Sequence, residues 1–174
     1  MELSEQMSGT RRLSHALFFG MLIGCLLVDQ ITKAWIVARL PPYRPTDLIP
    51  GLAPILSFTL VENTGVAFGL FPSLGQLFMW LAIVVVVGIL AFRRTIPAGD
   101  LWVHISLGLV TGGAIGNVID RLARGYVVDF IDVNFWPLAS WPVFNLADAA
   151  IVLGVGVLMV DSFLMERERL VIHA

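Results

Sequence analysis

Four long apolar stretches alternate with shorter polar segments along the chain. They cover about residues 13–37, 73–92, 101–119 and 146–164. Each is close to the roughly 20 residues that an α-helix needs to cross the hydrocarbon core of a bilayer. The pattern predicts a mainly α membrane protein in which residues 1–174 form one integral-membrane domain. Segments 38–72 and 120–144 would lie together on one side of the membrane.

Two short stretches between the predicted spans alternate polar and apolar residues instead. They are residues 57–62 and 126–131. A period of two is typical of a half-buried β-strand, so we expect a small β platform at the membrane surface. Aromatic residues before the fourth span, among them Trp141 and Phe144, are typical of the headgroup layer.

Glycines recur every four residues in the third predicted helix. Gly108, Gly112 and Gly116 share one helical face, and Ala150 and Gly154 have the same spacing in the fourth helix. A face without side chains lets a neighbouring helix approach closely. We therefore expect the third helix to be buried among the others.

Basic residues near the span ends set the expected orientation. The short connection 93–100 carries Arg93 and Arg94, whereas the much longer segment 38–72 also carries only two arginines. Because basic loops are retained in the cytoplasm, we expect both termini inside and segments 38–72 and 120–144 outside.

The composition agrees with a membrane protein and excludes several function classes. The chain is 57% apolar and 14% charged, against roughly 25% charged in soluble domains. Its 11 basic and 13 acidic residues provide no basic face for nucleic acid. A single cysteine excludes an internal disulfide and a multi-thiolate metal site. Residues 11–25 imitate an export signal, but the apolar segment continues past Cys25, so we expect no cleavage there.

Charged and amide side chains occur at the outer ends of the first and third spans. A charge within a span costs about 2.5–3.5 kcal/mol, so each needs an explanation. Asp29 and Lys33 lie four apart on one helix face and are either an ion pair reaching the interface or part of a site. Asn117, Asp120 and Arg121 end the third span, where a buried Asp–Arg pair holding the helix end is the simpler interpretation.

Two further carboxylates suggest acid–base catalysis. Asn145 and Asp148 open the fourth helix at the spacing of a capping box, and Asp129 lies in an apolar strand. Two carboxylates held together away from water share a proton and separate into an acid and a base. An aspartic hydrolase uses such a pair to activate water, with Asp148 the expected base because a helix N-terminus favours negative charge. The spacing of Asp129 and Asp148 permits them to meet but does not require it.

A proton-coupled transporter is the main alternative, since acids within a membrane often mark ion paths. However, Asp29, Asp120, Asp129 and Asp148 all map near one face, so no polar route crosses the bilayer. A purely structural scaffold would not explain why Asp129 lies in an apolar strand. The chain lacks a His-Glu-x-x-His motif, which argues against a metallopeptidase.

Five motifs in this order resemble those of the bacterial lipoprotein signal peptidases, also called signal peptidase II. They are DQITK from Asp29, ENTGVAFG from Glu62, GNVIDR from Gly116, VVDF from Val127 and FNLADAAI from Phe144. The resemblance implies that Asp129 and Asp148 are the catalytic pair. It also implies site-supporting roles for Asn63, Asn117, Asp120, Arg121, Asn145, Asp29 and Lys33.

Two of these positions suggest substrate contacts from their own chemistry. Asn63 and Gly65 lie beside a predicted strand, where a backbone edge can pair with an extended peptide and glycine admits close approach. Arg121 is an alternative contact for lipid or peptide carbonyls.

The resemblance also implies a reaction and a location. The reaction is cleavage of prolipoproteins on the N-terminal side of a diacylglyceryl-modified cysteine, without a metal or an organic cofactor. The fold would be four inner-membrane helices with a periplasmic β-cradle and a short mobile periplasmic helix or loop. Its expected partners are prolipoprotein substrates, membrane lipids and globomycin-type cyclic peptide inhibitors, and no nucleic acid.

Overall fold

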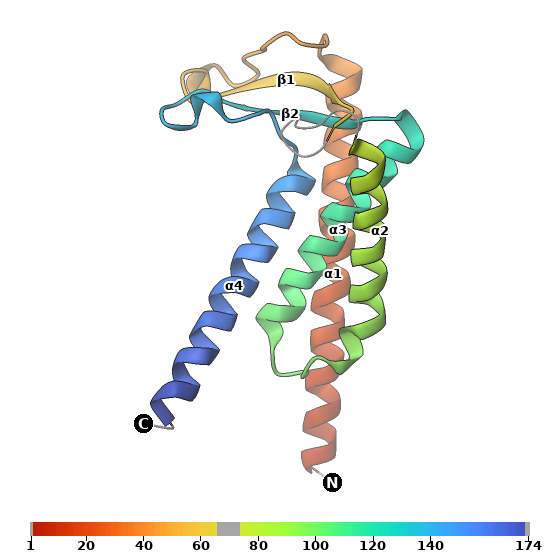
Figure 1. Ribbon diagram of the computed structural model, residues 1–174, viewed down its shortest axis with the longest axis vertical. Coiled ribbons are helices and arrows are strands. Elements are labelled where there is room, and N and C mark those ends of the chain that lie inside the picture. Colours follow the sequence, from red (N-terminus) through yellow and green to blue (C-terminus); the bar gives the residue numbers. More distant parts are fainter. Residues whose placement is uncertain (1, 66–73, 173–174) are drawn as a thin grey trace.

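The computed structural model describes residues 2–65 and 74–172. Among these residues, four helices are long and apolar enough to span a membrane. They are α1 (Glu2–Arg39), α2 (Gly75–Phe92), α3 (Leu101–Arg124) and α4 (Leu146–Ile172). The start of α1 and the end of α4 lie at the same end of the bundle (Figure 1). The prediction of a four-helix membrane fold is confirmed.

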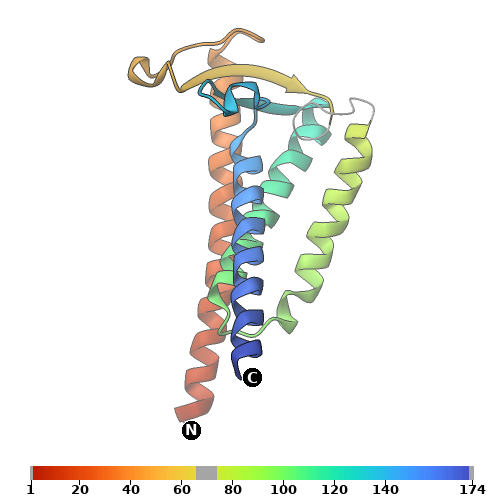
Figure 2. The same cartoon turned by 60° about the vertical axis from the view of Figure 1, so that its left-hand side comes forward.

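Helix α3 is the central helix and packs against α1, α2 and α4 (Figure 2). Its glycine face lies directly on the backbone of α1. A Cβ atom on Gly108 would come within 2.5 Å of the Phe18 carbonyl oxygen, and one on Gly112 within 2.6 Å of the Leu22 carbonyl oxygen. Only glycine permits this approach, as the sequence predicted.

The contact between α3 and α4 is built in the same way. A Cβ atom on Gly113 would lie 2.5 Å from the Ala147 carbonyl oxygen, and one on Gly154 would lie 2.7 Å from the Ser106 carbonyl oxygen. Close contact along α3 therefore fixes the start of α4 relative to the third helix.

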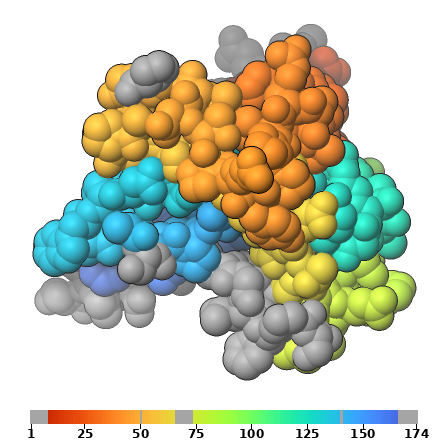
Figure 3. All heavy atoms as spheres, turned by 90° about the horizontal axis from the view of Figure 1, so that it is seen from above, coloured from red at the N-terminus to blue at the C-terminus, as the bar shows by residue number. Residues whose placement is uncertain are grey.

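The two predicted strands form a sheet across one end of the bundle (Figure 1). Strand β1 (Leu56–Asn63) pairs with β2 (Val127–Val133) in antiparallel register, with an irregularity between Phe58 and Val61. Seen from above, the orange and yellow chain leading through β1 and the cyan chain of β2 make up much of this face (Figure 3). The prediction of a small β platform is confirmed.

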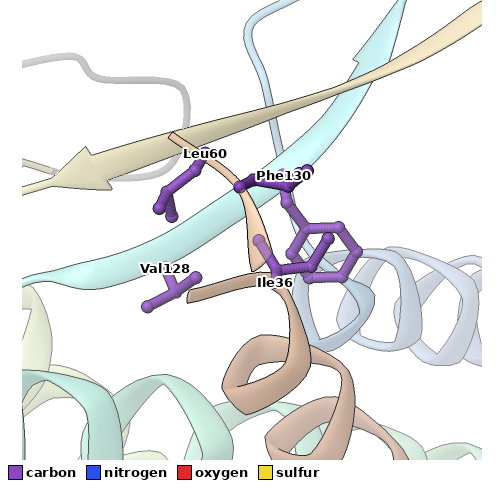
Figure 4. Close-up of a cluster of buried hydrophobic side chains, with 5 residues drawn as sticks. Ile36, Leu60, Val128 and Phe130 are labelled. Carbon is purple, nitrogen blue, oxygen red and sulfur yellow. The ribbon is translucent and has the colours of Figure 1, made fainter. Parts of the chain in front are cut away.

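A compact apolar cluster joins the sheet to α1. It is made by Ile36 of the helix, Leu40 directly after the helix, Leu60 of β1, and Val128 and Phe130 of β2 (Figure 4). Val128 is fully buried, and none of the five is more than 7% exposed. Successive side chains of a strand point to opposite faces. Packing of Val128 and Phe130 against α1 therefore directs the residue between them, Asp129, to the other face of β2.

Two helix boundaries bear on the site. Helix α3 continues to Arg124, beyond the end expected near residue 119, so Asp120 and Arg121 lie within the helix. Gly125, with φ of 83°, ends it in a left-handed conformation that turns the chain into β2. The predicted start of the second span at residue 73 and the motif positions 66–69 lie outside the described residues.

Besides β1 and β2, the described parts of the connections contain short helical turns. Turn η1 (Pro50–Leu52) follows α1, η4 (Arg93–Thr95) follows α2, and η5 (Leu138–Ser140) precedes α4. The last of these lies beside the start of α4, where the polar residues meet.

Candidate active site

Lys33 is the centre of a buried polar cluster at the sheet end of the helices. Its Nζ atom lies 2.9 Å from Oδ2 of Asp29 and 2.9 Å from Oδ2 of Asp120. It also donates a hydrogen bond of 2.9 Å to Oδ1 of Asn117. Lys33, Asp29 and Asp120 are 0% exposed. Asp29 and Lys33 are therefore not an ion pair that reaches the membrane interface, because partners from α3 bind the Lys33 ammonium inside the protein.

Asp120 ties the end of α3 to the sheet. Its Oδ1 accepts a hydrogen bond of 2.8 Å from Arg124, and its Oδ2 accepts one of 3.1 Å from the Val128 amide. The Asp–Arg pair expected at this helix end is present, but its arginine is Arg124. Residues four apart share a helix face, and adjacent residues do not. Arg121 instead donates to the carbonyl oxygen of Gly65 at 2.9 Å.

The start of α4 is held by two side chains. The Asn145 side chain accepts a hydrogen bond of 2.9 Å from the Asp148 amide, which confirms the predicted cap. Oδ1 of Asp29, from α1, accepts one of 3.1 Å from the Ala147 amide. The carboxylate of Asp148 does not close the capping box but accepts a hydrogen bond of 2.7 Å from Asn117. It is thereby directed toward α3.

Asp129 is 1% exposed and is held by two amide side chains. Its Oδ1 accepts a hydrogen bond of 2.6 Å from Asn145, and its Oδ2 accepts one of 2.8 Å from Asn63. Burial, together with the nearby negative charge of Asp148, raises the pKa of Asp129 to about 7. A carboxyl group with this pKa holds a proton in a large part of the molecules at neutral pH.

Two asparagines connect the carboxylates of Asp129 and Asp148. Asn145 donates to Asp129 and also to Oδ1 of Asn117 at 3.2 Å, and Asn117 in turn donates to Asp148. The structure thus gathers side chains of α1, α3, α4 and both strands into one network. A pair of carboxylates held in this way, one with a pKa near 7, can exchange protons with a bound reactant.

Gly65 lies at the edge of this network, beyond the end of β1. Its amide donates a hydrogen bond of 2.9 Å to Oδ1 of Asn63, and its carbonyl oxygen accepts from Arg121. Both backbone groups of Gly65 are therefore engaged within the chain. Arg121 orients this turn, which in turn holds the Asn63 amide that reaches Asp129.

Two contributors were missed from the sequence. Gln30 donates to the Gly116 carbonyl oxygen at 3.2 Å and to Oδ2 of Asp29 at 3.1 Å. Arg124 pairs with Asp120, as described above. The spacing of Asp120 and Arg124 on one helix was a usable signal. Nothing in the sequence indicates that Gln30 meets Gly116.

An apolar groove opens beside Asp148. It has a volume of about 410 Å³ and is lined by Val133, Leu138, Trp141, Phe144, Asp148, Ala149, Val152 and Leu153. Asp148 is the one ionisable residue in this lining. Trp141 and Phe144, expected at the headgroup layer, line the groove, together with the exposed Val152 and Leu153 of α4 and the carboxylate.

The described residues include no group of three or more histidine, cysteine, aspartate or glutamate side chains placed to hold a metal ion.

Comparison with known proteins decides the family. The family model described as signal peptidase II matches residues 21–164. The chain belongs to the signal peptidase II family. The chain is 36% identical to the lipoprotein signal peptidase of Shewanella amazonensis, over 94% of this chain and 93% of that protein. It is 42% identical to the one of Moorella thermoacetica, over 76% of this chain and 83% of that protein.

Solved structures of bacterial membrane enzymes share the fold. The fold is similar to a bacterial membrane enzyme determined by the in meso method at 2.3 Å resolution. The TM-score is 0.76 at 27% identity, over 84% of this chain and 87% of that one. Membership of the signal peptidase II family implies that the chain is a peptidase.

Proposed function

We propose that this chain removes signal peptides from prolipoproteins by cleaving directly before a diacylglyceryl-modified cysteine. The family supports the substrate class. The observation that supports the mechanism is the pair of asparagines that connects the carboxylates of Asp129 and Asp148. These two residues are the proposed catalytic dyad.

The two carboxylates take different roles. Asp148 lies in the first turn of α4, where the helix N-terminus favours negative charge, and acts as the general base. Asp129, with its pKa raised to about 7 by burial and the charge of Asp148, holds the proton and acts as the general acid. The dyad titrates as a unit, and this is its productive form.

Cleavage then proceeds in two balanced steps. Asp148 accepts a proton from water as the water oxygen bonds to the scissile carbonyl carbon, and Asp129 donates its proton to the developing oxyanion. When the tetrahedral intermediate collapses, the oxyanion proton returns to Asp129. The C–N bond breaks, and the leaving amine takes the proton held by Asp148. No metal or organic cofactor takes part.

The remaining polar residues position the dyad. Asn63, Asn117 and Asn145 orient the two carboxylates directly. Arg121 and Gly65 hold the turn behind Asn63. Asp29, Lys33 and Asp120 fix the ends of α3 and α4 on which the catalytic residues depend.

The groove beside Asp148 suits a lipid-modified substrate. Its lining is apolar apart from the carboxylate, so an acyl chain can lie in it while the modified cysteine reaches the dyad. We place the dyad near the periplasmic face of the bacterial inner membrane, with both termini in the cytoplasm. Prolipoproteins arrive by lateral diffusion among membrane lipids, and globomycin-type cyclic peptides would compete for the site.

Processing of a lipidated precursor in detergent tests this proposal. Asp129→Asn and Asp148→Asn are expected to remain folded and to lose cleavage. Asp132→Asn is the matched control, because Asp132 lies on the same strand but bonds Thr59 instead. It should cleave like the wild type, and a chelator should change nothing. Turnover close to wild type in either dyad variant, or cleavage away from the modified cysteine, would refute the proposal.

A further inference from the structure

Arginine and histidine side chains gather at the end of the bundle opposite β1 and β2. Arg93 and Arg94 belong to η4, which follows α2, and Arg11 and His15 lie in the first part of α1. Both segments lie far from the sheet (Figure 1). The proposed peptide cleavage uses none of these residues.

Arg93 is held in place by neutral groups. Its Nη1 atom lies 3.2 Å from Nδ1 of His15. Its guanidinium carbon is 4.7 Å from the ring centroid of Phe19 and 5.7 Å from that of Phe18. A guanidinium group only donates hydrogen bonds, so Nδ1 of His15 accepts, and the hydrogen of the neutral imidazole is on Nε2. These contacts orient Arg93 without neutralising it.

The arginines of this cluster form no ion pair with a carboxylate whose side chain the structure describes. The ion pairs among residues with described side chains involve Lys33 and Arg124, and neither Arg93, Arg94 nor Arg11. Arg11 and Arg94 are exposed and lie near enough to His15 for their charges to act on its ring. The cluster therefore presents several hydrogen-bond donors and net positive charge to its surroundings.

The position of the cluster suits the headgroup layer. The membrane-spanning stretch Gly75–Thr95 ends at Arg93 and Arg94. Phe92, directly before them, is 70% exposed and provides apolar surface on the side of the bilayer. A ligand with an anionic head and an apolar tail would satisfy both features, whereas a free phosphate ion would leave the apolar surface uncovered.

We propose that Arg93, with Arg94, Arg11 and His15, binds the phosphate of an anionic phospholipid. The planar guanidinium offers parallel N–H groups to two phosphate oxygens, and its fixed orientation reduces the entropy lost on binding. The acyl chains lie beside Phe92. In the proposed membrane orientation, this site faces the cytoplasmic leaflet.

Binding of phosphatidylglycerol to the purified full-length protein in detergent, measured by native mass spectrometry, tests this site. Arg93→Gln is expected to weaken binding about fivefold, the effect of about one surface charge. Arg39→Gln is the matched control, because Arg39 also lies over an aromatic ring, that of Trp35, but at the sheet end. It should change binding less than twofold. Arg94→Gln, which removes an exposed arginine, provides a second variant if Arg93→Gln does not fold.

Three outcomes would overturn the proposal. Equal weakening by Arg39→Gln and by the cluster variants would indicate attraction to any arginine. Displacement of the lipid by inorganic phosphate at matched concentration would assign the cluster to a soluble anion. Equal binding of phosphatidylcholine would show that the site does not distinguish anionic from zwitterionic headgroups. Because the assay needs no cleavage, its result is independent of the proposed peptidase mechanism.

Discussion

Replacing Lys33 by methionine tests the buried network that supports the dyad. Methionine keeps an unbranched side chain as far as Cε and removes the ammonium group, which leaves the carboxylates of Asp29 and Asp120 without their shared partner at 2.9 Å. Both are 0% exposed, so water cannot replace it. Removing one partner of a buried ion pair costs about 3–5 kcal/mol. At about 2–4 °C per kcal/mol for a chain of this size, Tm should fall by roughly 6–20 °C.

Thermal unfolding of the purified protein in detergent measures this change. Arg124→Gln is the matched control, because it removes the other positive partner of Asp120 at a side chain that is 28% exposed. A partly exposed pair contributes at most about 1 kcal/mol, so the control should lose only a few degrees. Lys33→Met should also slow cleavage, since Asp29 holds the Ala147 amide at the start of α4. Equal losses of Tm in the two variants would refute this reasoning.

Four further predictions concern the pKa of Asp129 and two individual contacts. Cleavage should fall as pH rises through about 7, because Asp129 then loses the proton it donates, and a flat pH–rate profile from 6 to 8.5 would contradict this. The raised pKa of Asp129 also contributes to the free energy of unfolding: the contribution is complete below about pH 3.8 and is lost as the pH rises through about 7. Asp129→Asn should therefore make the free energy of unfolding depend less on pH. Gly112→Ala places a methyl group 2.6 Å from a backbone carbonyl oxygen and should destabilise the protein by about 1–3 kcal/mol in denaturant titrations, whereas Gly20→Ala, with open space around it, should not. Asn117→Ala should lower kcat while changing KM less, because the carboxylate of Asp148 loses the hydrogen bond that orients it. An unchanged kcat would exclude a role of Asn117 in positioning Asp148.

The helices and strands were predictable because their signals are local. Apolar stretches of sufficient length mark the spans, and the alternation around Phe58 and Asp129 marks the strands. The glycine face of α3 was also visible, since a four-residue repeat needs no knowledge of its partner. In each case neighbouring residues carry the information.

The site contacts were less predictable because they join distant segments. Lys33 was open to interpretation as an ion pair at the interface, since its partners Asn117 and Asp120 lie on another helix. The same holds for Asp29, which bonds the first turn of α4. Arg124 rather than Arg121 pairs with Asp120 because α3 continues as far as Gly125, which ends the helix. The family resemblance supplied the list of residues, and the structure supplied their partners.

We propose that two carboxylates, from β2 and α4, share one proton, which is held on Asp129. Infrared difference spectroscopy across pH measures this directly through the C=O stretch of a protonated carboxyl group. The account predicts a band that titrates with a midpoint near pH 7, is absent in Asp129→Asn, and shifts to lower pH in Asp148→Asn. A band that persists in Asp129→Asn, or that titrates near the ordinary value of 3.8, would contradict it.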